Sequence, residues 1–151
     1  MHFSSVGLIA KTGSQQVLES LRRVLTFLRS QDLNIVLEAS SAERLTGFEK
    51  LSDLSEMGEC CDLVIAVGGD GNILGAARAL APMGVPILGV NRGRLGFLAD
   101  ISPEAIETQI GAVLAGDFVT EDHFLLEGEV LGHDEIHSAL NEVLILSLIH
   151  I

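Results

Sequence analysis

Residues 63–72 have the sequence LVIAVGGDGN, in which an apolar run meets a cluster of glycines around one aspartate. The run Leu63–Val67 is apolar throughout, as is typical of a parallel strand covered on both faces. The spacing then predicts a helix from about Asn72 to Ala81, which Pro82 stops. A buried strand that passes through a glycine turn into a helix predicts an open α/β fold, with its ligand at the carboxyl end of the sheet.

The rest of the first 116 residues repeats this alternation of strand and helix. Short apolar runs predict strands, and apolar residues at spacings of three and four predict helices. The expected strands are Val6–Ala10, Leu33–Leu37 and Pro86–Val90; the expected helices are Gln15–Arg29, with Ser14 as N-cap, and 103–114, with Gly116 after it. The pattern predicts a parallel sheet with flanking helices over residues 1–116, although residues 39–58 show no assignable pattern.

Residues 117–151 differ from the first 116 in their pattern of apolar and polar residues. Extended segments with polar alternation occur at Leu125–Leu131 and Ile136–Leu148. We expect them to be the first strands of a second, β-rich domain that is incomplete here. The apolar run Leu144–Ile151 supports this, because an uncapped apolar strand invites association.

Composition excludes several classes of function. Nine basic residues face twenty-one acidic ones, for a formal net charge of −12, and the basic residues scatter between Lys11 and Arg94. Such a chain is repelled by a nucleic-acid backbone, so no nucleic-acid partner is expected. There is no basic, apolar leader and no apolar run of ~18–20 residues, so we expect no membrane partner and a cytoplasmic location. Adjacent Cys60 and Cys61 predict two thiols rather than a strained disulfide.

The turn Gly68-Gly69-Asp70-Gly71 carries the first candidate chemistry. Glycines let a phosphate approach the backbone, and the following helix offers unpaired amides and the positive end of its dipole. Asp70 is suited to accept a proton from a hydroxyl nucleophile or to help coordinate magnesium. The alternative is a plain tight turn with an aspartate cap. A dinucleotide fingerprint does not fit, because Gly75 comes one residue too late, and no Gly-Lys-Ser/Thr of a P-loop occurs.

A second constellation, residues 91–98 with the sequence NRGRLGFL, directly follows the fourth expected strand. Neighbouring strands would place this loop beside Asp70. Asn91 both donates and accepts hydrogen bonds, Phe97 is suited to stack on an adenine ring, and Arg92 and Arg94 supply local positive charge. The alternative is an ordinary surface turn with solvated arginines.

Two further polar groups lie in the last third of the chain. Asn141 and Glu142 interrupt an apolar strand, so they need partners, either in a structural network or on ligand hydroxyls. His133 and His137 are four residues apart, but the intervening glutamate does not match the His-Glu-x-x-His zinc pattern and no third ligand is evident. We assign no residue of the chain as a metal ligand.

Together, the turn at 67–72, the loop at 91–98 and the Asn141-Glu142 pair, in this order, closely resemble NAD kinases, with spacing like that of the gamma-proteobacterial branch. The resemblance covers residues 6 to 143. It implies a Rossmann-like N-terminal domain and an all-β C-terminal domain, assembled into dimers or tetramers. It also implies transfer of the γ-phosphoryl group of ATP, with magnesium, to the 2′-hydroxyl of the adenosine ribose of NAD, which gives NADP.

The resemblance also assigns roles to residues. Asp70 matches the proton acceptor and, with Gly71, contacts NAD. Phe97 matches a residue that lies against the adenine, and Asn141 and Glu142 match residues that hold NAD hydroxyls. We assign the phosphate and turn positions to five further residues: Gly68, Gly69, Asn91, Gly93 and Gly96. Family members continue well beyond this length, so we expect residues 1–151 alone to be inactive.

Other classes stay open on the sequence. The Gly-Gly-Asp-Gly signature also occurs in diacylglycerol and sphingosine kinases and in phosphofructokinases. The loop at 91–98 and the Asn141-Glu142 pair favour NAD over lipid or sugar phosphate. A non-catalytic nucleotide-binding module is an alternative of another class. The phosphoryl donor, ATP or polyphosphate, is not determined by these patterns.

Overall fold

The computed structural model describes residues 2–11, 13–42, 45, 51–92, 98–99, 101–129, 132 and 136–140. The chain forms two compact units, Met1–Val119 and Thr120–Ile151. Within the described residues, none of the helices has the length and apolar character needed to cross a membrane.

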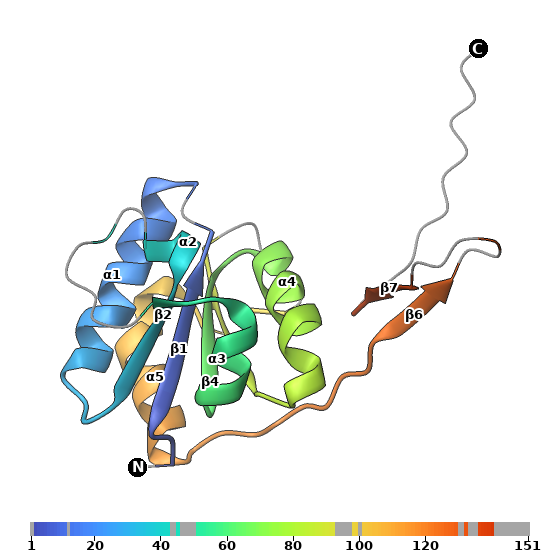
Figure 1. The fold of residues 1–151 in the computed structure, drawn as a ribbon. Helices are drawn as coiled ribbons and strands as arrows, with labels where there is room; N and C mark the ends of the chain where they lie inside the picture. Colours follow the sequence, from blue (N-terminus) through green and yellow to red (C-terminus); the bar gives the residue numbers. More distant parts are fainter. Residues whose placement is uncertain are drawn as a thin grey trace. The chain divides into compact units, whose positions relative to one another are not determined.

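The first unit is built on a five-stranded parallel sheet with the strand order β3-β2-β1-β4-β5 (Figure 1). The strands are β1 Ser5–Ala10, β2 Asn34–Glu38, β3 Leu51–Ser52, β4 Leu63–Gly68 and β5 Ile87–Asn91. The chain runs outward from β1 to β3, then returns to β4 beside β1 and runs outward the other way. The parallel sheet predicted from the sequence is therefore confirmed, and its topological switch lies between β1 and β4.

Helices cover both faces of this sheet (Figure 1). Helices α1 and α5 pack on one face, and α3 and α4 pack on the other. Strand β4 is buried along its whole length, with Leu63, Ile65 and Val67 in the first core and Val64 and Ala66 in the second. The helices are α1 Gln15–Arg29, α2 Ala39–Ala42, α3 Leu54–Cys60, α4 Asp70–Leu80 and α5 Ile106–Ala115.

Local signals fix the ends of the longest helices. Helix α1 begins after Ser14, whose side chain accepts a hydrogen bond from the Val17 amide at 3.2 Å, as the sequence predicts. Helix α5 ends at Ala115, and Gly116 stops it, as predicted, in a left-handed conformation with φ +93°. The expected start at residue 103 is a 3₁₀ turn, Pro103–Ala105, that leads into α5.

The predicted bounds of the helix after the glycine turn need correction. We expected Asn72 to Ala81, but α4 begins at Asp70, because Gly69 in an extended conformation already serves as its N-cap. At the other end, α4 stops at Leu80 and a 3₁₀ turn, Ala81–Met83, accommodates Pro82. The shift places the Asp70 carboxylate in the first turn of the helix, where the helix dipole favours negative charge.

The stretch that gave no pattern contains three short elements, α2, β3 and α3. Strand β3 pairs with β2 through Leu37 and Leu51. Asp53 caps α3 by accepting the Glu56 amide at 2.8 Å. Cys60, the last residue of α3, is half-buried, and Cys61 directly after it is buried; the two are thiols with no disulfide between them, as expected.

The second unit contains an antiparallel pair, β6 Leu126–Glu129 and β7 Ile136–Ala139, in which Leu126 is paired with Ala139. Both strands lie within segments predicted to be extended. Residues 130–131 and 141–148 of those segments lie outside the described residues. The assignment of this unit to an incomplete β-rich domain stays a prediction.

Candidate functional site

The glycine turn lies at the carboxyl end of β4, next to the topological switch of the sheet. Gly68 has φ +156°, and a Cβ added to it would lie 3.2 Å from the Cβ of Asn72. The Asn72 side-chain amide closes the turn by donating to the Val67 carbonyl oxygen at 3.1 Å. The first turn of α4 follows directly, so its backbone amides and the half-buried Asp70 share this end of the sheet.

The second predicted loop begins beside this turn. Gly68 of β4 pairs with Asn91 of β5, and the Arg92 amide donates to the Gly68 carbonyl oxygen at 2.8 Å. Further along, the Leu98 amide faces the Asp70 carboxylate, with N to Oδ1 at 3.4 Å. The expectation that the loop that begins at Asn91 lies at the same end of the sheet as the Asp70 turn is confirmed for the described residues.

Arg92 does not project freely into solvent. Its guanidinium donates to the hydroxyl of Ser20, a fully buried residue of α1. Arg92 is half-buried and lies against the helix that covers the first face of the sheet. The alternative of a turn with solvated arginines is therefore wrong for Arg92. This hydrogen bond ties Arg92 to α1.

Several predicted site residues lie outside the described part of the chain, so their placement stays a prediction. They share a position in the 91–98 loop or after β7, and they are Gly93, Gly96, Phe97, Asn141 and Glu142. The predicted residues that the structure brings together are Gly68, Gly69, Asp70, Gly71 and Asn91, at adjoining strand ends.

A cavity of about 230 Å³ opens at the same end of the sheet, between the end of β1 and the first turns of α4. Its polar lining comes from Lys11, Glu38 and Ser40 on one side and from Asn72 on the other, with Gly71 and Gly75 beside it. Sequence reasoning missed Lys11, Glu38 and Ser40. They could have been found from their positions at the carboxyl ends of β1 and β2, because the carboxyl ends of parallel strands lie at the same edge of a sheet.

A larger cavity, of about 410 Å³, lies between His2 and the C-terminal ends of α1 and α5, next to Gln31 and Leu114. The C-terminal end of a helix presents carbonyl oxygens and the negative end of its dipole, which disfavours a phosphate. We therefore place the chemistry at the smaller cavity.

Glu38 is held by a compact set of hydrogen bonds. Its Oε2 accepts from the Ser41 amide at 2.8 Å, the Ser41 hydroxyl at 2.6 Å and the Ser40 hydroxyl at 2.7 Å, while Oε1 accepts from the Ser40 amide at 3.1 Å. Partial burial raises the pKa of Glu38, but the hydrogen bonds from Ser41 and Ser40 outweigh it. The pKa lies below its ordinary value, so the carboxylate is charged at neutral pH.

Among the residues that the structure describes, His, Cys, Asp and Glu side chains form no group of three or more that could hold a metal ion. Both oxygens of Glu38 already accept hydrogen bonds from Ser40 and Ser41. Mg²⁺ is usually held by one or two carboxylates together with substrate phosphates and waters. Asp70, the carboxylate at the glycine turn, is the residue that would contact a magnesium ion that arrives with a phosphate ligand.

Comparison with known proteins identifies the family to which the chain is similar. Residues 6–118 match the family model of the ATP-NAD kinase N-terminal domain. The chain belongs to the NAD kinase family. The resemblance inferred from the three motifs is thus confirmed, and the Gly-Gly-Asp-Gly turn and most of the 1–119 unit fall within the matched residues.

Individual relatives agree with the family match. The chain is 47% identical over 148 residues to the NAD kinase of Pseudomonas fluorescens (strain SBW25), and 48% identical over 147 residues to that of Pseudomonas putida (strain W619). Each match covers 95% of this chain and 50% of the relative, so the chain spans about half the length of these curated relatives.

A solved structure shows the same fold. The yeast NADH kinase, solved in complex with NADH, is similar with a TM-score of 0.72 at 16% sequence identity. The similarity covers 92% of this chain and 46% of the yeast chain. It supports the predicted α/β fold with a parallel sheet and flanking helices.

Proposed function

We propose that this chain is the N-terminal part of an NAD kinase, which transfers the γ-phosphoryl group of ATP to the 2′-hydroxyl of the adenosine ribose of NAD. One observation carries the proposal: in a member of this family, Asp70 lies in the first turn of α4, directly after the glycine turn and at the switch point of the sheet. Open α/β sheets bind their ligands at this point.

Asp70 is the proposed proton acceptor. A ribose hydroxyl is a weak acid, so the carboxylate need not have a raised pKa; it must be hydrogen-bonded to the 2′-oxygen as the new P–O bond forms. The Leu98 amide, 3.4 Å from Oδ1, helps to orient the carboxylate. When bound, Mg²⁺ would neutralise part of the negative charge of the ATP phosphates.

The other roles are proposals of the same kind. Gly71, Phe97, Asn141 and Glu142 bind NAD. The glycines of the two loops let the ligand approach the backbone, and Asn91 supports them. We further propose Mg²⁺ as the cofactor, a homo-oligomer and a cytoplasmic location. We expect residues 1–151 alone to form no NADP, because this chain spans only about half the length of the Pseudomonas fluorescens relative.

The test is a full-length kinase that joins residues 1–143 of this chain to the C-terminal half of the Pseudomonas fluorescens relative, called the chimeric kinase below. Asp70→Asn should lower kcat by ~10²–10⁴-fold, the usual contribution of a general base, with an unchanged circular dichroism spectrum. Asp32→Asn is the matched control, because Asp32 is exposed in the turn before β2, at the amino end of the sheet. An Asp70→Asn variant with a tenth of wild-type turnover would contradict the assignment.

A substrate panel separates NAD kinase from the kinases that share the glycine signature. We expect phosphorylation of NAD, and none of diacylglycerol, sphingosine or fructose 6-phosphate. A folded chimeric kinase that forms no NADP would refute the proposed function.

A further inference from the structure

Two adjacent cysteines bring their sulfur atoms together where α3 ends. Cys60 is the last residue of α3 and Cys61 is its C-cap, and their Sγ atoms lie 3.8 Å apart. Cys60 is half-buried, whereas Cys61 is only 7% exposed. The pair therefore reaches from the surface into the core between the sheet and α3.

A third sulfur-containing side chain lies close to Cys61. A Cβ added to Gly7 of β1 would lie 2.5 Å from Cε of Met57 and 3.3 Å from Sγ of Cys61, so both side chains border the same point on the sheet. Met57 is fully buried and comes three and four positions before the cysteines, a spacing that puts side chains on one face of a helix. The end of α3 thus gathers two thiols and a thioether.

The distance between the two thiols suits a shared metal ion. Metal–thiolate bonds are ~2.3 Å long, so two sulfur atoms 3.8 Å apart subtend an angle of ~110° at one ion. This angle fits an ion that has three or four ligands. The two sulfur atoms are therefore already placed to bind the same ion.

The donor set selects a soft ion with few ligands. Structural zinc requires four thiolate, imidazole or carboxylate ligands. Among the described residues, the side chains of these types form no group of three or more that could hold a metal ion, so the pair does not suit zinc. Thiolate and thioether sulfur together favour Cu(I), for which two or three sulfur ligands suffice.

Negative charge flanks the cysteine pair. Glu59 and Asp62 come directly before and after it in the chain, and both are exposed. The Asp62 carboxylate is fixed by the amides of Ser4 and Ser5, which donate to it at 2.8 and 3.1 Å. These carboxylates attract a cation and repel an anion, so the surroundings also favour a metal ion as the ligand.

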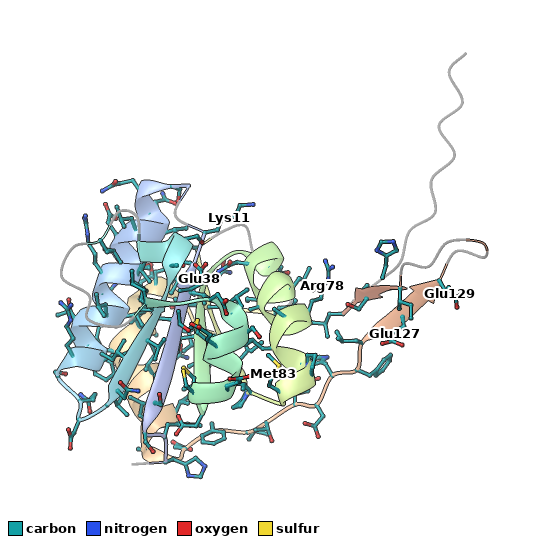
Figure 2. All side chains as sticks on the ribbon, in the orientation of Figure 1. Lys11, Glu38, Arg78, Met83, Glu127 and Glu129 are labelled. Carbon is teal, nitrogen blue, oxygen red and sulfur yellow. The ribbon has the colours of Figure 1, made fainter. Side chains whose placement is uncertain are left out.

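The cysteine pair is separate from the candidate site at the glycine turn. Cys61 comes just before β4, at the amino end of the sheet, whereas the glycine turn follows the carboxyl end of the same strand. Figure 2 shows Met83, which lies next to α3, toward one end of the sheet and Lys11 and Glu38 toward the other. A ligand of the cysteine pair therefore does not occupy the glycine turn.

We propose that Cys60 and Cys61 bind one Cu(I) ion through their thiolate sulfur atoms, with the Met57 thioether as the third ligand. Each thiol releases its proton to water as its bond to copper forms. Copper stays in the Cu(I) state, so no oxidant or reductant is consumed. The ion enters at the half-buried Cys60 and reaches Cys61 from there. Copper binding is independent of the proposed kinase activity.

The binding test titrates the reduced 151-residue chain with Cu(I) under anaerobic conditions, with bicinchoninic acid as the competing chelator. One Cu(I) per chain should leave the chelator, and the ultraviolet charge-transfer absorption of copper–thiolate bonds should appear. Cys60→Ser should weaken binding by ~100-fold or more, because loss of an outer partner of a metal site already costs ~10–100-fold. Circular dichroism checks that the variant is folded. A chain that takes no Cu(I), or a Cys60→Ser variant with wild-type affinity, would overturn the inference.

A matched pair of methionine variants tests the third ligand. Met57→Leu keeps an apolar side chain of similar volume but removes the thioether, so Cu(I) binding should weaken by ~10-fold with little loss of stability. Met83→Leu is the control, because Met83 packs against Gly58 instead, where an added Cβ would lie 3.0 Å from its Cγ. Equal effects of the two variants would refute Met57 as a ligand.

Competition with zinc tests the choice of ion. Excess Zn²⁺ should leave Cu(I) on the chain, because the pair lacks the further ligands that zinc requires. X-ray absorption at the copper edge should show sulfur neighbours alone. Displacement of Cu(I) by Zn²⁺, or nitrogen neighbours around copper, would contradict the proposed ligand set.

The chimeric kinase separates copper binding from the proposed function. Without copper, Cys60→Ser should leave its rate of NADP formation unchanged, because the cysteine pair lies at the other end of the sheet from Asp70. If the chimeric kinase formed no NADP, the proposed function would fail while Cu(I) binding by the 151-residue chain would stand. Loss of NADP formation in folded, metal-free Cys60→Ser would refute the separation of the two sites.

Discussion

Gly89 of β5 allows the backbone of Leu98 and Ala99 to approach the sheet closely. A Cβ at this position would lie 2.6 Å from Cδ1 of Ile73, 2.9 Å from the Leu98 carbonyl oxygen and 3.0 Å from the Cα of Ala99. The end of the Ile73 side chain can move, but the other two atoms belong to the backbone. Gly89→Ala therefore has to push the Leu98–Ala99 backbone away from β5.

The expected cost follows from these distances. Overpacking a tight core typically destabilises by ~1–3 kcal/mol, and contact with backbone atoms favours the upper half of that range. The displaced backbone includes the Leu98 amide, which lies 3.4 Å from the Asp70 carboxylate. We expect Gly89→Ala to lose ~2–3 kcal/mol in free energy of unfolding and to weaken the contact between the Leu98 amide and Asp70.

Gly75 supplies the matched control, because the same substitution there should have the opposite sign. It lies inside α4, and an added Cβ would meet no atom within 4 Å. Replacing glycine by alanine in a helix interior stabilises by roughly 0.5–1 kcal/mol. One methyl group should thus destabilise the protein in β5 and stabilise it in α4.

Urea unfolding followed by circular dichroism at the helix band measures both effects. With a slope of ~1–3 kcal/mol per molar urea, the midpoint should fall by about 1 M or more for Gly89→Ala and rise by a few tenths of a molar for Gly75→Ala. A Gly89→Ala midpoint at or above that of the wild type would refute the reasoning from the close approach.

Three further predictions follow from the first unit. Ser41→Ala should cost ~1–3 kcal/mol, because it leaves the Ala10 amide without its hydroxyl acceptor, whereas Ser40→Ala at an exposed position should cost under ~1 kcal/mol; urea midpoints compare the two. Glu38 has a lowered pKa, so its stabilisation is present above the unfolded pKa and is lost as pH falls through the folded pKa. The stability gap between wild type and Glu38→Gln should therefore be full at pH 7 and close below pH 4.5, the ordinary value, in urea titrations at each pH. A thiol reagent should label one half-buried cysteine in the native state and the buried one only on unfolding, as mass spectrometry can show.

The elements that could be predicted from the sequence are those with local causes. Helix α1 repeats an apolar face over fifteen residues and begins with its own capping serine, so its bounds follow from the sequence alone. Strand β4 is apolar at every position because both sheet faces are covered, and this too is visible locally. The misplaced start of α4 came from treating Gly69 and Asp70 as turn residues, when Gly69 caps the helix and Asp70 lies within it.

The elements that could not be predicted have distant causes. Strand β3 is two residues long and exists through its pairing with β2. Helix α2 has four residues, and its Ser41 bonds to Ala10, thirty-one positions earlier. Neither element is long enough to show a hydrophobic period, so no window of sequence around 39–58 identifies it.

The candidate site likewise contains residues that could be predicted from the local sequence and residues that could not. The glycine turn and Asp70 carry a recognisable signature, so the acceptor side of the proposed reaction could be named from the sequence. Lys11 and Glu38 belong to no motif. They line the cavity beside α4 because the strand order puts β1 between β2 and β4, which brings three strand ends together. In this fold the topology supplies that part of the cavity lining, which becomes visible only once the order of the strands is known.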